Sequence, residues 1–325
     1  DTGRTHHLIE EQEFYNYINY RRFYQVMKMT GHKVNIANVA FHTVNYLVFG
    51  LFTLICIYPF YYILIYSLSD TTKASMGVYL LPEGFTLYNY YSLLTNEGIA
   101  NAALITVLRT VTGTALAVFC TALFGYLLTK KELPFRRLIY RLVVMTMYIN
   151  AGLIPYYMMI KAIGLRNSFF VYIIPYAVGA FNLILIKTFI EQMPPSIEES
   201  AMVDGAGYLI LFVKLIFPLS LPIIATVTVF TAVFQWNSFS DNLIFVTNPK
   251  LQTLQMLLYR ILQNVAEARQ NVRTDEMARN IRIVQPTPTT IRMTITMIVT
   301  LPILFVYPFL QRYFVKGIML GAVKG

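Results

Sequence analysis

Residues 99–129 read IANAALITVLRTVTGTALAVFCTALFGYLLT, a run in which Arg109 is the one charged side chain. The hydrocarbon core of a bilayer is about 30 Å thick, and roughly 20 apolar residues of α-helix are needed to cross it. The run is long enough to do so and predicts a transmembrane helix. An all-α membrane protein is therefore the expected fold class.

The composition of the whole chain agrees with this expectation. Of its 325 residues, 56% are hydrophobic and 13% are charged, and the mean hydropathy is +0.54. A soluble domain carries about a quarter charged residues. These values exclude a disordered chain, a disulfide framework and an ordinary cytosolic enzyme. The net charge of +10 would suit binding to nucleic acid or to anionic lipid. Because the chain is so hydrophobic, we expect membrane lipid and not nucleic acid as its partner.

Five further stretches are apolar and uncharged, so the sequence predicts six transmembrane helices in all. These stretches are residues 41–67 and the segments between Arg141 and Lys161, between Arg166 and Lys187, between Lys214 and Asp241, and between Arg292 and Arg312.

The orientation follows from the basic residues of the short loops, which favour the cytoplasmic side. The second connection, residues 129–141, carries Lys130, Lys131, Arg136, Arg137 and Arg141, whereas the first carries Lys73 alone. We therefore expect both termini and the second and fourth connections in the cytoplasm. The last connection is also basic yet must lie outside, and long loops cross the membrane largely regardless of charge.

The chain divides into an N-terminal cytoplasmic segment, residues 1–37, and a six-span domain, residues 38–325. Apolar residues recur every three or four positions over residues 8–30, which predicts an amphipathic helix on the membrane surface or on a partner. A solvated helix without a specific role remains an equal alternative. The six-span domain has a cytoplasmic loop at about 192–217 and an external loop at about 242–291.

The cytoplasmic loop reads PPSIEESAMVDGA over residues 194–206. Two prolines stop the preceding helix, and Ser196 with Glu199 forms the pattern of a capping box that starts a new one. Gly205 suits the left-handed conformation that ends a helix. A second helical stretch, residues 208–217, then runs into Pro218. The loop is predicted as a short helix, a sharp turn and another helix, against the alternative of a plain connection.

The same loop resembles the EAA motif of ABC-importer permeases. That motif reads E-A-A, three residues, G, nine residues, I, any residue, L-P. This chain has Glu199-Ser200-Ala201, then Gly205, then Leu215-Ile216-Phe217-Pro218, with the spacing kept and changes at Ser200, Leu215 and Phe217. The Trp236-Asn237 pair and the tail at 313–325 are similar to the carbohydrate-importer branch, and the resemblance covers residues 38–325.

The resemblance implies the fold of a type I importer permease, as in maltose-type and complex-oligosaccharide permeases. It places the chain in the bacterial inner membrane. The implied partners are a second permease, expected to be a different chain, two ATPase subunits that bind ATP and Mg, and an extracytoplasmic solute-binding protein that delivers an oligosaccharide. This chain itself is expected to hold no cofactor, no metal and no catalytic residue.

The EAA loop would be the coupling helix that docks in a groove of an ATPase subunit. The resemblance assigns the partner contact to Glu199 and the turn to Gly205. The neighbouring residues complete the predicted coupling set, which is Glu198, Glu199, Ala201, Asp204, Gly205 and Ala206.

Polar side chains inside the predicted spans are candidates for the substrate pathway, because amides bind sugar hydroxyls and aromatic rings stack on sugar faces. Interhelical hydrogen bonding is the alternative for the amides. Arg109 would line the path of an anionic sugar or, as we favour, snorkel to the interface or form an ion pair. The candidates are Arg109, Tyr148, Asn150, Tyr176, Asn182, Gln235, Trp236 and Asn237.

The external loop has three more basic than acidic residues between 251 and 292, which permits an acidic, uronate-type cargo. Pairing with an acidic partner surface is the preferred alternative. A permease for another solute is the main alternative function. A secondary transporter would be expected to show paired ionisable residues in its spans, and a membrane enzyme a catalytic cluster, and neither is evident in the sequence.

Overall fold

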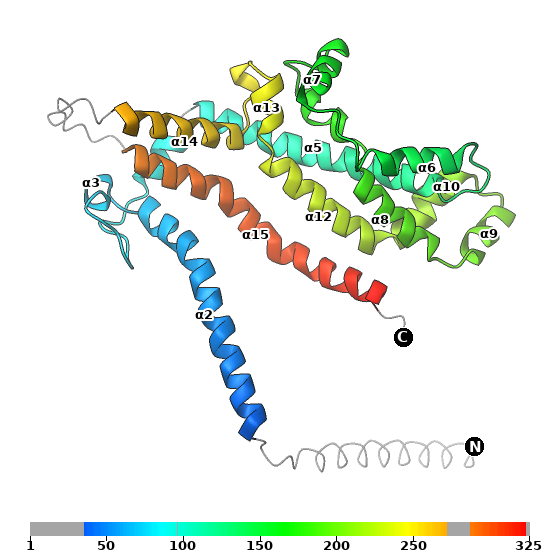
Figure 1. Ribbon diagram of the computed structural model, residues 1–325, viewed down its shortest axis with the longest axis horizontal. Helices are drawn as coiled ribbons and strands as arrows, with labels where there is room; N and C mark the ends of the chain where they lie inside the picture. Colours follow the sequence, from blue (N-terminus) through cyan, green and yellow to red (C-terminus); the bar gives the residue numbers. More distant parts are fainter. Residues whose placement is uncertain (1–35, 96, 272–286, 323–325) are drawn as a thin grey trace, which may run out of the picture. The chain divides into compact units, whose positions relative to one another are not determined.

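The computed structural model describes residues 36–95, 97–271 and 287–322, and all of its regular elements there are helices (Figure 1). The chain forms two compact units, Asp1–Tyr61 and Tyr62–Gly325, and their boundary falls inside α2 (Ile36–Ser67). The predicted amphipathic helix at 8–30 lies outside the described residues. The predicted division at residue 37 stays a prediction.

Three described helices are long and apolar enough to cross a membrane. They are Phe41–Ser67 within α2, Gly98–Leu127 within α5 (Glu97–Leu127), and Pro288–Phe305 within α15 (Pro288–Ala322). These correspond to the first, second and sixth predicted spans. The first coincides with the predicted residues 41–67, because nothing interrupts its apolar run.

The fourth and fifth predicted spans are bent rather than straight. The fourth consists of η1 (Phe169–Tyr172), η2 (Ile174–Tyr176) and α8 (Ala180–Glu191), with a bend of 44°. The fifth consists of α10 (Tyr208–Leu211), η3 (Phe212–Ile216), α11 (Phe217–Leu219) and α12 (Leu221–Asn237), with a bend of 83°. Pro218 and Pro222 flank the second bend, and a proline ring and its missing N–H interrupt the helical hydrogen-bond ladder. Counting each bent group as one span, the described residues provide up to five.

The third predicted span is not a single helix. It is divided into α6 (Arg136–Met145) and α7 (Leu153–Ala162), each ten residues long. Gly152 has a φ of +82°, and its N–H donates to the Asn150 side chain at 2.9 Å, which stabilises a turn in place of a continuing helix. The predicted count of six spans therefore stays a prediction, although the all-helical fold is confirmed.

The shorter helices connect these spans. They are α3 (Thr71–Ala74) and α4 (Tyr88–Leu94) in the first connection, α9 (Ser196–Val203) in the fourth, and α13 (Ser240–Phe245), η4 (Pro249–Leu251) and α14 (Leu254–Asn271) in the last.

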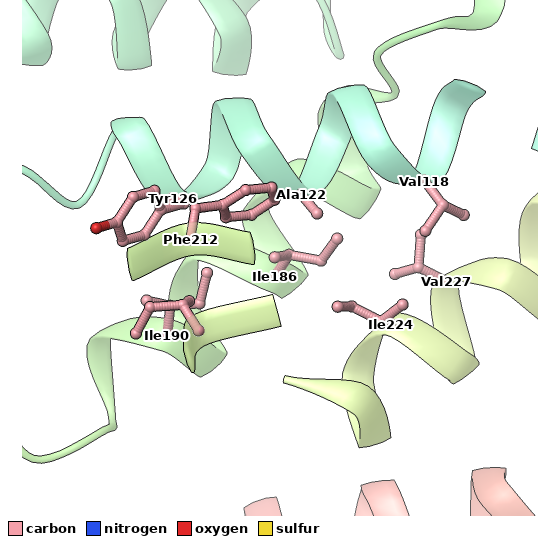
Figure 2. Packing of buried hydrophobic residues seen from close by; sticks show 9 residues of the cluster. Val118, Ala122, Tyr126, Ile186, Ile190, Phe212, Ile224 and Val227 are labelled. Atoms are coloured by element: carbon pink, nitrogen blue, oxygen red, sulfur yellow. The ribbon is translucent and has the colours of Figure 1, made fainter. Parts of the chain in front are cut away.

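The centre of the second unit is α5, which packs against α8 and α12, while α12 also packs against α15 (Figure 1). A cluster of buried residues joins α5, α8, η3 and α12 (Figure 2). In it, the rings of Tyr126 and Phe212 stack with centroids 5.5 Å apart. This stack links the end of α5 to η3, which follows the loop that contains α9, so that loop emerges from a packed region.

Candidate functional site

The short helix α9 begins at the predicted position, but not through a capping box. Pro195 occupies the N-cap position, and Ser196 is the first helical residue with no side-chain cap bond. The carbonyls of Pro194 and Pro195 instead accept the N–H groups of Ile197, Glu198 and Glu199 at 3.0 to 3.2 Å. The capping-box prediction was wrong, because the two prolines already supply helical backbone and carbonyl acceptors before Ser196. The acidic first turn still complements the helix dipole.

The end of α9 is the predicted left-handed turn. Gly205 has a φ of +83°, its N–H donates to Met202 O at 3.0 Å, and the Ala206 N–H donates to Ala201 O at 3.1 Å. These two bonds form a Schellman motif, which satisfies carbonyls at the helix end. No heavy atom lies within 4 Å of a Cβ added at Gly205, so the backbone conformation, not space, requires glycine here.

The two neighbouring glutamates of α9 have different surroundings. Glu198 is partly buried and forms an ion pair with Lys130, which follows the end of α5. The Lys130 ammonium lies 4.2 Å from the centroid of the Tyr126 ring, the same ring that stacks on Phe212. Glu199 is exposed, and no ion pair of it occurs among the described residues. Glu198 thus joins α9 to the residue that follows α5, whereas the carboxylate of Glu199 is exposed.

The exposed surface of α9 combines acid and apolar groups. Val203 is 87% exposed and Met202 is 39% exposed, while Glu199 and Asp204 are exposed beside them. Ala201 and Ala206 are half-buried, and their small side chains do not protrude from this surface. Exposed apolar residues ringed by polar ones mark protein contact surfaces.

Two of the predicted pathway residues meet in one pocket. Tyr176 of η2 and Asn182 of α8 line a cavity of about 370 Å³ together with three phenylalanines and Thr231. The Tyr176 ring contacts Phe234 edge-on at 5.0 Å, and the Asn182 amide donates to Thr231 Oγ1 at 3.4 Å. Sequence reasoning missed Phe230, Thr231 and Phe234 of α12, and the one signal in the sequence is that Phe230 and Phe234, four residues apart, share a helix face.

Arg109 and Gln235 belong to a buried network instead. Arg109 is fully buried, and its guanidinium donates to both carboxylate oxygens of Asp241, at 2.5 and 3.1 Å. Gln235 Oε1 accepts from the same guanidinium at 2.9 and 3.2 Å, and the Tyr172 ring lies 4.5 Å away. The favoured interpretation of Arg109 was snorkelling or an ion pair, and the structure has the ion pair. Snorkelling was wrong, because Asp241 neutralises the guanidinium inside the chain and Gln235 accepts further hydrogen bonds from it.

Arg109 of the second span therefore has an acidic partner, although that partner, Asp241, lies outside the spans. Asp241 stands immediately beyond the fifth apolar stretch, and α13 carries it back onto α5. The sequence held one signal of this, since Asp241 is the acidic residue that closes that stretch. A fork-like Arg–carboxylate pair with every donor engaged is a structural brace between helices.

The remaining candidates lie apart from the pocket lining. Tyr148 is exposed, and Asn150 forms the turn before α7. The Trp236 indole donates to Val299 O at 3.1 Å, and Asn237 accepts from Gln255 at 3.1 Å. The structure therefore places these four in helix contacts, a turn or on the surface, and brings only Tyr176 and Asn182 of the predicted set together in that pocket.

Comparison with known proteins identifies the family of this arrangement. Residues 117–320 match the family model described as "Binding-protein-dependent transport system inner membrane component". The polygalacturonan/rhamnogalacturonan transport system permease protein YtcP of Bacillus subtilis is 36% identical, over 85% of this chain and 95% of its own length. Protein LplC of the same organism is 35% identical, over 91% of this chain and 98% of its own length.

A solved structure has the same fold. The crystal structure of a bacterial ABC transporter that imports the acidic polysaccharide alginate contains a chain with a TM-score of 0.77 and 27% identity. The match covers 87% of this chain and 99% of that one.

These matches confirm the resemblance drawn from the EAA pattern. Members of this family are membrane permeases and not enzymes, and the ATPase is a separate subunit. As general kinds, their partners are a second permease, an ATPase and a solute-binding protein. This chain therefore belongs to the binding-protein-dependent transport system inner membrane components, the multi-pass inner-membrane permeases of ABC importers.

Proposed function

We propose that this permease imports acidic, uronate-type oligosaccharides delivered by an extracytoplasmic solute-binding protein. The relatives that support this cargo are named for polygalacturonan, rhamnogalacturonan and alginate. The surplus of basic residues in the last connection is consistent with an acidic cargo. Both termini and the loop that contains α9 would face the cytoplasm.

The coupling part of the proposal rests on one observation, the exposed surface of α9 closed by the left-handed turn at Gly205. In the proposed complex, α9 inserts into a groove of an ATPase subunit, with Glu199 and Asp204 facing basic residues there and Val203 and Met202 filling its apolar part. Two ATPase subunits bind ATP and Mg, and their closure moves α9. The second permease is proposed to be a different chain.

The movement of α9 has a defined route into the membrane domain. The Glu198–Lys130 ion pair joins α9 to the end of α5, and the stacked rings of Tyr126 and Phe212 join α5 to η3. Because the Lys130 ammonium also lies over the Tyr126 ring, a displacement of α9 would be transmitted to α5 and η3 together. Movement of the docked helix α9 would therefore displace the second and fifth spans.

The proposed sugar contact of this chain is the pocket of Tyr176 and Asn182. Its aromatic rings suit the apolar faces of sugar rings, and its amide and hydroxyl groups suit their hydroxyls. The lining residues of this pocket carry no charge. The carboxylates of an acidic cargo would therefore be bound outside it, and not by Arg109, which Asp241 already neutralises.

Uptake by the reconstituted four-subunit complex with its binding protein tests the cargo. Oligogalacturonates should be transported and should stimulate ATP hydrolysis, whereas neutral oligosaccharides of equal length should not. Equal uptake of both classes would contradict the acidic cargo while leaving the coupling proposal intact. ATPase subunits that fail to copurify with this chain would contradict the coupling proposal itself.

A further inference from the structure

The basic connection between α5 and α6 forms a hollow that the transport mechanism does not use. Its lining consists of Lys131, Leu133, Phe135, Arg136, Arg137, Leu138 and Arg141, around a volume of about 740 Å³. Four of these side chains are cationic and none is acidic. No salt bridge of these four occurs among the described residues. Such a concentration of unneutralised charge favours an anionic ligand.

One face of α6 carries exposed apolar side chains next to these charges. Leu138, Leu142 and Met145 follow each other at steps of four and three, and each is 53% exposed. Arg137 and Arg141 are four residues apart and line the adjoining side of the helix. An apolar stripe bordered by arginines is the pattern of a helix that lies at a membrane interface.

The opposite side of α6 is already occupied. Tyr140 lies under the ammonium of Lys187 on α8, with 4.7 Å between the ammonium and the ring centroid. Arg136 donates to Thr129 O at 3.0 Å and holds the beginning of α6 against the end of α5. The rotation of α6 about its axis is thereby fixed, and Arg137, Arg141 and the apolar stripe point away from the chain.

Phe135 adds a second apolar group at the edge of the hollow. It has a φ of +55°, a left-handed conformation that is unfavourable for a residue with a large side chain. Its ring is exposed and belongs to the lining. The backbone thus holds an aromatic ring in the open next to four cations, which no contact of the described chain explains.

The position of the hollow defines what can reach it. The apolar part of α5 ends at Leu127, and the lining begins at Lys131. The hollow therefore lies where a membrane span leaves the hydrocarbon layer, at the depth of the lipid headgroups. A ligand there would offer a phosphate to the arginines and acyl chains to Leu138, Leu142 and Phe135.

We infer that this hollow is a binding site for the headgroup of an anionic phospholipid, whose acyl chains lie along the apolar stripe of α6. Guanidinium groups pair with phosphate through two parallel hydrogen bonds. Basic pockets beside transmembrane helices suit such headgroups. The inference concerns this surface alone and does not depend on the cargo.

The test compares lipid binding by the purified complex in nanodiscs that contain phosphatidylcholine and phosphatidylglycerol, read by native mass spectrometry. The wild type should retain phosphatidylglycerol in preference. Each basic residue near an anionic headgroup adds roughly fivefold to its binding, so Arg137→Gln with Arg141→Gln should lower the retention about 30-fold. The matched control, Lys161→Gln with Arg166→Gln, removes two exposed cations outside the hollow and should retain the lipid as the wild type does.

Two further arms separate the sources of the phosphate. Leu138→Ser with Leu142→Ser should also lower lipid retention, and inorganic phosphate should not displace the bound lipid. Raising the salt concentration should weaken the preference of the wild type, a measurement that needs no variant.

Several outcomes would overturn the inference. Equal retention of both lipids by the wild type, or unchanged retention by the double arginine variant, would remove the site. Displacement by inorganic phosphate would make it a phosphate site without lipid. Efficient crosslinking of Arg141→Cys to a partner subunit, with no lipid retained, would show that an acidic protein segment fills the hollow.

Discussion

The carboxylate of Glu198 forms an ion pair with Lys130 at the end of α5, whereas the adjacent carboxylate of Glu199 is exposed. Two neighbouring acids of one short helix thus face in different directions. One holds the helix to its own chain, and the other is exposed and, in the proposed complex, faces the ATPase. The predicted coupling set, which includes both residues, therefore contains two separable parts.

This division predicts different defects for the two glutamates. Glu199→Ala should weaken binding of the ATPase subunits, while Glu198→Ala should leave them bound but lower transport per ATP hydrolysed, because α9 loses its link to α5. Exchanging the charges, Glu198→Lys with Lys130→Glu, should restore coupling. ATPase copurification and the transport-to-hydrolysis ratio measure these effects, and identical losses for both alanine variants would contradict the division.

The turn at Gly205 predicts a strong dependence on residue type. Gly205→Val should cost about 1–2 kcal/mol in the left-handed conformation, so the turn would open and transport would fall. Sugar binding to the solute-binding protein should persist. Gly205→Asn is the matched control and should retain most of the activity, since asparagine tolerates this conformation better. Normal transport by the valine variant would sink the assigned role of the turn.

The buried pair of Arg109 and Asp241 predicts a large effect on stability. Arg109→Met alone leaves an unpaired buried carboxylate and should destabilise the protein by about 3–5 kcal/mol. Arg109→Met with Asp241→Leu removes both charges and should recover most of this loss. Thermal unfolding of the purified protein measures both variants. Equal destabilisation by the single and the double variant would show that the unpaired carboxylate is not the cause of the loss.

The close approach of Gly113 to this network predicts a second stability effect. A Cβ at Gly113 would lie 2.7 Å from the amide nitrogen of Gln235, which is itself held by Tyr172 O. Gly113→Ala should therefore destabilise by about 1–3 kcal/mol through overpacking. Gly125→Ala on the same helix meets atoms no closer than 3.5 Å and should be neutral or stabilising. Thermal unfolding of the two variants gives the comparison.

The pocket of Tyr176 and Asn182 predicts an effect on substrate alone. Tyr176→Ala and Asn182→Ala should raise the KM for uptake about tenfold, as expected from the loss of one stacking or hydrogen-bonding contact. ATPase copurification should not change. Tyr148→Ala, an exposed tyrosine outside the pocket lining, is the control. An unchanged KM in the two pocket variants would move the sugar contact elsewhere in the complex.

The sequence by itself determined the all-helical membrane fold and the helix and turn of the loop at 194–206. Apolar length alone decides whether a helix can cross a bilayer, so the apolar stretch 41–67 of α2 was recognisable from the sequence. The Gly205 turn was equally predictable, because a left-handed backbone restricts the residue type locally. Both features depend on neighbours in the chain, which a sequence displays directly.

Tertiary structure decided which polar groups meet. Asp241 comes 132 residues after Arg109, and only the return of α13 onto α5 makes them a pair. The same holds for Lys130 and Glu198, 68 residues apart, and for the pocket shared by Tyr176 and Phe234. Such contacts depend on the packing of distant helices, because the position of a side chain in the chain does not fix which of its possible partners is within reach.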